Sequence, residues 1–259
     1  MRLAVCAEMV FLDLPFTERV RRIHESGFDV ELWDSRTKDI AALKATGAVF
    51  SSMTGYTAGS LVDPDTADDV VRTAEMLIPT ALELGVSRLV VHPAELVDGK
   101  AARPAYRPDG RMWLTGTRTL QRLGALGEKH GLTFCLENLN TVLDHPGIPL
   151  ARAKDTLALV EAAAHPNVKL MLDLYHAQLG EGNLISLVRS ALPHIGEIQV
   201  ADVPGRCEPG TGEINYAAVA QALAAAGYDG TVGMEAWASS DDQAALEAFR
   251  QAFAVELAA

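Results

Sequence analysis

Cysteine is scarce in this 259-residue chain, which contains only Cys6, Cys135 and Cys207. They are odd in number, widely spaced and form no CxxC pair. This pattern argues against a disulfide framework and against a cysteine-based zinc site. Because free thiols are typical of a reducing compartment, we expect the protein to be cytoplasmic.

Basic residues are also few, with 22 Lys and Arg against 34 Asp and Glu and a formal net charge of −12. A nucleic-acid-binding protein usually presents a basic face, so we expect no nucleic-acid partner. No apolar run approaches the roughly 18 residues of a membrane span. Glu8 and Asp13 interrupt the first stretch too early for a signal peptide, so we expect no membrane association either.

What the sequence does contain is an alternation of short apolar runs and helical patterns. Each run has strand length and is rich in Val, Ile, Leu or Met, and each is followed by loop residues and an amphipathic stretch. The expected strands are 2–7, 28–33, 48–53, 87–91, 132–137, 168–173, 195–199 and 231–235. The expected helices are 15–26, 37–46, 65–84, 116–130, 153–164, 184–191, 216–226 and 241–257.

Eight strand–helix units in a chain of about 250 residues predict an α/β fold, a single (β/α)₈ TIM barrel. We find no linker or change of composition, so residues 1–259 are expected to form one domain. A doubly wound open sheet is the alternative. It normally carries a Gly-rich loop after its first strand, where this chain reads Cys6-Ala-Glu-Met-Val10.

Four consecutive strands of the expected barrel end in a side chain with a ligand oxygen: Glu137, Asp173, Gln199 and Glu235. Parallel strands bring their carboxyl ends to one mouth, where three carboxylates without a cation would repel one another and take up protons. Oxygen ligands suit Mg²⁺ or Mn²⁺ better than Zn²⁺. We therefore predict a divalent metal site, with structural ion pairing as the alternative.

The residues two positions before the three carboxylates are Cys135, Met171 and Gly233. Alternate residues of a strand share a face, so these residues should lie directly below the ligands. The site is therefore expected to have a small, apolar floor.

Four further residues after the strands are candidates for substrate binding: His92, His176, Arg206 and Trp237. Arg206 lies in a Gly/Pro-rich loop and could pair with a substrate carboxylate in bidentate fashion, or brace the loop through an ion pair. Trp237 could form a wall of the pocket or pack into the core. The two histidines could contact substrate or be ordinary polar residues at the mouth.

Other segments have open roles. Glu31 and Trp33 end the second strand and are further pocket candidates. Asp202 and Glu213 are expected to brace the loop after the seventh strand. The basic segment from Lys100 to Arg111 is a lid, an oligomer contact or a solvated loop.

One long motif resembles the hydroxypyruvate isomerases. It reads Ile195-Gly-Glu-Ile-Gln-Val-Ala-Asp-Val-Pro-Gly-Arg206 and continues Glu208-Pro-Gly-Thr-Gly-Glu-Ile-Asn215. Glu137-Asn-Leu-Asn140, Pro146-Gly147 and Asp173-Leu-Tyr-His176 are similar to the same family, which belongs to the xylose-isomerase-like barrel superfamily. The similarity is densest from the fifth strand to the eighth.

The resemblance implies roles for these residues. Glu137, Asp173, Gln199 and Glu235 match the family's metal ligands, and Glu137 and Glu235 also match its acid/base pair. His176 and Arg206 match substrate-contacting positions. The third ligand of the related ketose 3-epimerases is usually His, so a Gln here favours the hydroxypyruvate isomerase branch.

Two positions depart from that branch. Asn138 stands where a Pro is common, and Ala236-Trp237-Ala238 stands where Tyr-Lys-Pro is common, which removes a cation beside the substrate. A ketose 3-epimerase or other sugar isomerase, a lyase or dehydratase of the same superfamily, and a non-catalytic binder therefore stay open as alternatives.

The expected activity is that of a metal-dependent aldose–ketose isomerase acting on a small molecule. Its substrate would be hydroxypyruvate, giving tartronate semialdehyde (2-hydroxy-3-oxopropanoate), or a related short 2-oxo acid. Two carboxylates can move the proton between adjacent carbons while a metal ion stabilises the enediolate. Barrels of this type often assemble, so a homo-oligomer is an open expectation.

Overall fold

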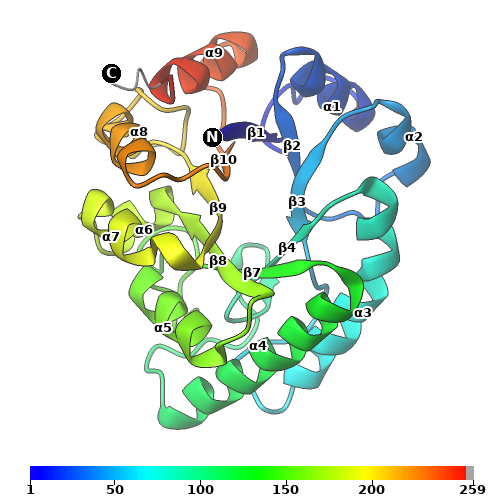
Figure 1. Ribbon diagram of the computed structural model, residues 1–259, viewed down its shortest axis with the longest axis vertical. Helices are drawn as coiled ribbons and strands as arrows, with labels where there is room; N and C mark the ends of the chain where they lie inside the picture. The colour runs from blue at the N-terminus through cyan, green and yellow to red at the C-terminus, as the bar shows by residue number, and fades with distance from the viewer. Residues whose placement is uncertain (255–259) are drawn as a thin grey trace.

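The computed structural model describes residues 1–254, and its eight barrel strands form a closed ring with helices around the outside (Figure 1). The ring runs β1-β10-β9-β8-β7-β4-β3-β2, and every neighbouring pair is parallel. The predicted (β/α)₈ barrel is therefore confirmed. The barrel strands are β1 (Arg2–Cys6), β2 (Asp29–Leu32), β3 (Phe50–Thr54), β4 (Arg88–Val91), β7 (Thr133–Glu137), β8 (Val168–Asp173), β9 (Ile195–Val200) and β10 (Thr231–Met234).

The helices cover the outer face of this ring and bury the main hydrophobic core against it. They are α1 (Phe16–Glu25), α2 (Ile40–Ala45), α3 (Ala67–Leu84), α4 (Gly110–His130), α5 (Ala153–Ala163), α6 (Leu174–Gly180), α7 (Leu184–Ala191), the 3₁₀ turn η1 (Leu192–His194), α8 (Tyr216–Ala225) and α9 (Asp242–Ala252). None of the helices within residues 1–254 combines the length and the apolar character needed to cross a membrane.

The apolar stripe of α3 shows how the pattern produces the packing. Val70, Ala74, Leu77 and Ala81 are all buried, as their helical spacing predicts. Full burial of a Leu or Val side chain contributes about 1.5–3 kcal/mol. The helix continues through Pro79, which lies on its exposed face.

Three elements differ from the sequence expectation. Helix α4 begins at Gly110 rather than near residue 116, because the Asp109 carboxylate caps it by accepting from Met112 N at 2.9 Å. A short hairpin, β5 (Leu96–Val97) and β6 (Lys100–Ala101), and the helix α6 had not been expected. The predicted extension of the last helix to Leu257 lies outside the described residues.

Candidate metal centre and substrate cavity

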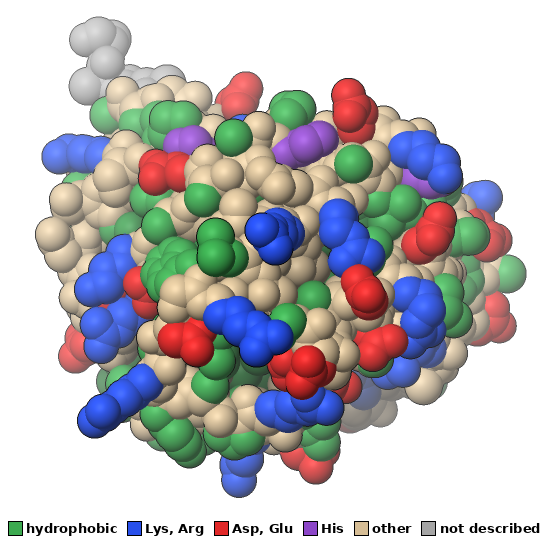
Figure 2. Space-filling view, turned by 90° about the horizontal axis from the view of Figure 1, so that it is seen from below, with side chains coloured by type: hydrophobic (Ala, Val, Ile, Leu, Met, Phe, Trp, Pro, Cys, Tyr) green, Lys and Arg blue, Asp and Glu red, His purple; other side chains and the backbone are tan. Residues whose placement is uncertain are grey.

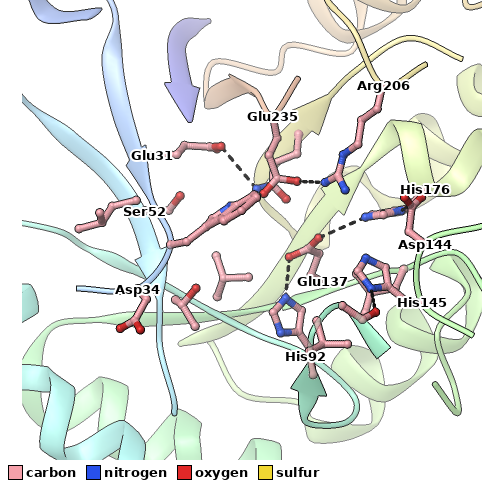
Figure 3. Close-up of a pocket in the computed structure, with 18 residues that line it drawn as sticks. Glu31, Asp34, Ser52, His92, Glu137, Asp144, His145, His176, Arg206 and Glu235 are labelled. Carbon is pink, nitrogen blue, oxygen red and sulfur yellow. Dashed lines mark hydrogen bonds and ion pairs between the residues drawn. The ribbon is translucent and has the colours of Figure 1, made fainter. Parts of the chain in front are cut away.

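The carboxylates of Glu137, Asp173 and Glu235 meet at the mouth of the barrel, where β7, β8 and β10 end, together with the imidazole of His176. One ligand atom from each lies within 4.8 Å of the others, and all four residues are buried. Figure 3 shows three of these side chains, those of Glu137, His176 and Glu235, beside the cavity. His176 Nε2 is 3.8 Å from Glu137 Oε1 and 3.8 Å from Asp173 Oδ2. The barrel thus brings the three predicted carboxylates together and adds a histidine to them.

Asp173 is fixed by two local interactions. Asn138 bridges β7 and β8, because its Nδ2 donates to Asp173 O at 2.8 Å and its Oδ1 accepts from Asp173 N at 3.0 Å. Asp173 Oδ1 accepts from His176 N at 2.8 Å and so caps α6, which leaves Oδ2 to face the cluster. Asn138, a departure from the resembled family, therefore sets the position of a candidate ligand.

The electrostatics of the cluster call for a cation. Burial, and then the neighbouring Glu235 carboxylate, raise the pKa of both Glu137 and Asp173 well above its usual range. Burial, and then the nearby Arg206, lower the pKa of His176 well below its usual range. Without added positive charge the cluster therefore holds protons on its carboxylates, as the sequence predicted.

The side chains fit a divalent ion. Carboxylate oxygens and an imidazole nitrogen are common ligands of divalent metals. His176 Nε2 and Gln199 Oε1 are buried, and neither has a hydrogen-bond partner among the described residues. A buried polar atom without a partner is costly, and a bound cation would satisfy both atoms. This buried group can therefore hold a metal ion.

Gln199 lies on β9, in register with Asp173 on β8 and with Gly233 on β10. Its Nε2 donates to Glu31 Oε2 at 3.4 Å, and its side chain lines the cavity beside the cluster. Its role as a metal ligand stays a prediction.

Two residues hold the carboxylate of Glu235. Trp33 Nε1 donates to Glu235 Oε1 at 2.6 Å, and Arg206 Nη2 forms an ion pair with Glu235 Oε2. Burial opposes the charge of Arg206, but Glu235 and Asp173 outweigh this effect and raise its pKa. Both oxygens of Glu235 thus have donors, which keeps the carboxylate in one orientation.

The loop that carries Arg206 is organised around the buried side chain of Asp202. Its carboxylate accepts from Val203 N at 2.9 Å, from Ile214 N at 3.0 Å and from Gly210 N at 2.9 Å. The predicted bracing role of Asp202 is confirmed. The side chain of Glu213 instead faces outwards and bonds to Gln178, while its backbone N donates to Val203 O.

His92 contacts Glu137 directly, since its Nε2 lies 3.0 Å from Glu137 Oε2 (Figure 3). Burial lowers the pKa of His92 to about 4, so the ring is neutral at neutral pH. Its Nδ1 lies 3.1 Å from the hydroxyl of Tyr56, which can also donate to Ala94 O at 3.2 Å. Because this hydroxyl has two acceptors in reach, it can satisfy either tautomer of His92 as Glu137 gains or loses its proton.

The cluster opens into a cavity of about 430 Å³. Among the described residues that line it, Arg206 is the only Lys or Arg. His92, His176, Glu31 and Trp33 line it as well. Trp237 is not one of the lining residues. It is 40% exposed, and its backbone N donates to Arg206 O, so its contact with substrate stays a prediction.

Sequence reasoning missed several lining residues, most of which lie in loops or within strands, and it did not single out Thr54 at the end of β3. They are Leu96, Gly99, Asp144 and His145, with Asp34, Ser52 and Thr54 on the opposite wall. Asp144 accepts from Asn140 Nδ2 at 2.6 Å and from Tyr175 Oη at 3.0 Å. The polar run after the fifth strand was the available signal for Asp144 and His145.

The β5–β6 hairpin forms part of the cavity wall. His145 Nδ1 lies 2.6 Å from Gly99 O, which ties the hairpin to the loop after β7. Further along the basic segment, Arg103 forms a 3.0 Å ion pair with Asp63. The hairpin end of the segment thus borders the cavity. Whether the segment acts as a lid stays open.

The floor of the barrel is apolar on one side only. Val90, Cys135 and Met171 form a small hydrophobic cluster there, as predicted. On the other side the expectation is wrong, because the space above Gly233 is filled by the carboxyl group of Glu31. Burial, and then the charges of Glu197 and Glu235, raise the pKa of Glu31 well above its usual range.

The chain belongs to the xylose isomerase-like TIM barrel family, whose model matches residues 14–255. A mouse protein with the provisional name hydroxypyruvate isomerase is 32% identical over 162 residues, which are 62% of this chain and 57% of the mouse protein. The 2-oxo-tetronate isomerase of Pectobacterium atrosepticum is 28% identical over 90% of this chain and 91% of its own length.

The solved structures agree on the architecture. A protein described as AP endonuclease, family 2, from Brucella melitensis superposes with a TM-score of 0.85 at 26% identity, over 96% of this chain and 98% of its own. The predicted kinship with the xylose-isomerase-like superfamily is therefore confirmed, and the two relatives described above bear the names of isomerases.

Proposed function

We propose that the protein is a metal-dependent isomerase of short 2-oxo acids, which converts hydroxypyruvate or a close analogue to the isomeric aldehyde. One observation carries the proposal: the buried carboxylates of Glu137 and Glu235 meet in one cluster that could hold a metal ion, beside a cavity of about 430 Å³. The names of the relatives, a hydroxypyruvate isomerase and a 2-oxo-tetronate isomerase, support the same class of substrate.

The two carboxylates are suited to opposite halves of a proton transfer. Glu137 removes the proton from the carbon beside the carbonyl group, and Glu235 delivers one to the neighbouring carbon. His92 contacts the first carboxylate, while Trp33 and Arg206 orient the second. Mg²⁺ or Mn²⁺ bound by Glu137, Glu235 and their neighbours would offset the negative charge that develops on the substrate oxygens.

Asp173 and Gln199 complete the proposed ligand set, and His176 lies where it can reach either the ion or a substrate oxygen. Arg206 is the candidate partner for the substrate carboxylate. A guanidinium can bind a carboxylate while it keeps its pairing with Glu235, because it carries five N–H donors.

A second candidate is a ketose 3-epimerase or another sugar isomerase that uses the same two carboxylates. The charge of the cavity favours it, because the cavity wall carries Asp34 and Asp144, and its single guanidinium is already paired with Glu235. A neutral, hydroxylated substrate meets less repulsion there than an anion does. The volume of about 430 Å³ also leaves space for a sugar longer than three carbons.

Proton exchange in D₂O distinguishes the two candidates. The protein is loaded with Mn²⁺ or Mg²⁺ and incubated with hydroxypyruvate, and in parallel with fructose, tagatose and a tetrulose, and NMR follows each mixture. Deuterium in hydroxypyruvate together with an aldehyde product supports the 2-oxo acid isomerase. Exchange only at C3 of a ketose supports the epimerase, and no exchange with any substrate contradicts both.

Replacing Glu235 by Gln tests the assigned chemistry. The amide keeps the size of the side chain but can neither accept nor deliver the proton, so turnover should fall about 10²- to 10⁴-fold. The far-UV circular dichroism spectrum should not change. Glu213→Gln, which neutralises an exposed carboxylate of the same barrel face, is the matched control and should keep full activity. Near-normal turnover in the Glu235 variant would remove this residue from the mechanism.

A further inference from the structure

Glu31 is a buried carboxyl group that the proposed proton transfer does not use. It belongs to β2, and β1 lies between β2 and β10 in the ring, yet its carboxyl occupies the space that a side chain at Gly233 on β10 would take. A Cβ at position 233 would overlap both its Oε1 and its Cδ. The absence of a side chain at Gly233 is therefore what lets Glu31 enter the barrel interior at this level.

The carboxyl group meets the amide of Gln199 there. Glu31 Oε2 accepts from Gln199 Nε2 at 3.4 Å, and both side chains are buried. The end of a primary amide carries one oxygen, which accepts hydrogen bonds, and one NH₂ group, which donates them. An acceptor next to the amide attracts the NH₂ group, so the oxygen points away from that acceptor. With Nε2 turned to Glu31, Gln199 Oε1 is the atom left over, and it has no partner among the described residues.

We infer that Glu31 is a positioning residue that turns the amide oxygen of Gln199, and not its nitrogen, towards the metal cluster. This inference rests on the proposed function, because it concerns one member of the proposed ligand set. An amide binds a cation through its oxygen, so a rotated Gln199 would present N–H groups to a positive charge. Partners behind a ligand typically account for 10- to 100-fold in metal affinity.

The test measures Mn²⁺ affinity by isothermal titration calorimetry, which needs no substrate. Glu31→Met keeps the length of the side chain and removes the acceptor, and it should weaken Mn²⁺ binding about 10- to 100-fold. Glu31→Gln can present its own amide oxygen to Gln199 Nε2, and it should restore binding to within about threefold of the unmodified protein. A residue that only filled space would give the same affinity in both variants.

Ser52→Ala is the matched control. Ser52 pairs with Glu31 in the sheet register, but among the described residues it forms no hydrogen bond with Gln199 and is not one of the clustered ligand candidates, so its variant should bind Mn²⁺ normally. Gly233→Ala supplies a second route, because its methyl group displaces the Glu31 carboxyl without altering Glu31 itself. It should weaken Mn²⁺ binding like Glu31→Met, and it decides the question if the Met variant fails to fold.

The outcomes separate this inference from the proposed function. Normal Mn²⁺ affinity in a folded Glu31→Met or Gly233→Ala protein overturns the positioning role and leaves the proposed isomerase standing. No Mn²⁺ binding by the unmodified protein overturns the metal centre and this inference together.

Discussion

The buried carboxylate of Asp202 is the part of the Arg206 loop whose replacement has the most predictable cost. Asp202→Asn preserves the shape of the side chain and changes one oxygen to an NH₂ group. Oδ1 keeps its bonds to Val203 N and Ile214 N, but the new NH₂ group faces the N–H of Gly210, so a donor meets a donor. The hydrogen bond from Gly210 N is lost. The bonds from Val203 N and Ile214 N become weaker, because their acceptor is no longer charged.

The magnitude follows from these three bonds. A hydrogen bond to a charged group contributes about 1.5–3 kcal/mol, and a neutral bond is roughly half as strong. Because a neutral amide is less costly to bury than a carboxylate, part of the loss is offset. We expect Asp202→Asn to lower the free energy of unfolding by about 2–4 kcal/mol. KM for the substrate should rise, since the same loop carries Arg206.

Equilibrium unfolding in guanidinium chloride, followed by circular dichroism, measures the loss. The control is Glu213→Gln in the same loop, whose exposed side chain accepts a hydrogen bond from Gln178 at the surface. The change in the unfolding free energy of this variant should stay within about 0.5 kcal/mol. If Asp202→Asn were no less stable than this control, the loop would not depend on the buried carboxylate, and the reasoning would be refuted.

Two further predictions concern the cluster itself. Trp33→Phe removes the N–H that bonds to Glu235 at 2.6 Å, so kcat/KM should fall about 10- to 100-fold while the fold is retained. An unchanged kcat/KM would show that Arg206 alone orients Glu235. The raised pKa values of Glu137 and Asp173 mean that the metal-free protein holds protons that a cation must displace. Apparent Mn²⁺ affinity should therefore rise with pH, by about tenfold per pH unit for each displaced proton. Calorimetry in buffers of different ionisation enthalpy can measure the number of protons released. An affinity independent of pH would contradict the raised pKa values.

The position of the three carboxylates followed from the sequence because topology leaves little freedom. Each of Glu137, Asp173 and Glu235 comes at the end of an apolar run, and parallel strands in a closed barrel place those ends on one rim. The strand register needed no further information, since one face of every strand is the barrel interior. The fold and the main cluster could therefore be predicted together.

What escaped prediction depends on contacts between distant segments or on residues with two roles. Asp173 ends a strand and caps a helix at once, so no loop separates β8 from α6 and the usual signal of a boundary is missing. The strands of the β5–β6 hairpin have two residues each, too few for any periodicity to appear. The contact of Glu31 with Gln199 joins positions 168 residues apart, and a strand glutamate carries no sign of its partner.

Under the proposed function, the hairpin after β4 would contact the substrate without taking part in its conversion. Leu96 and Gly99 border the cavity, yet the hairpin contributes none of the four clustered ligand candidates. It contacts the segment after β7 through His145 and through the packing of Leu96 and Ala101. Such a segment can lengthen, shorten or be exchanged between relatives while the strand ends stay as they are. A chimera that carries the hairpin of another family member should therefore change the range of substrates while the residues at the strand ends stay the same.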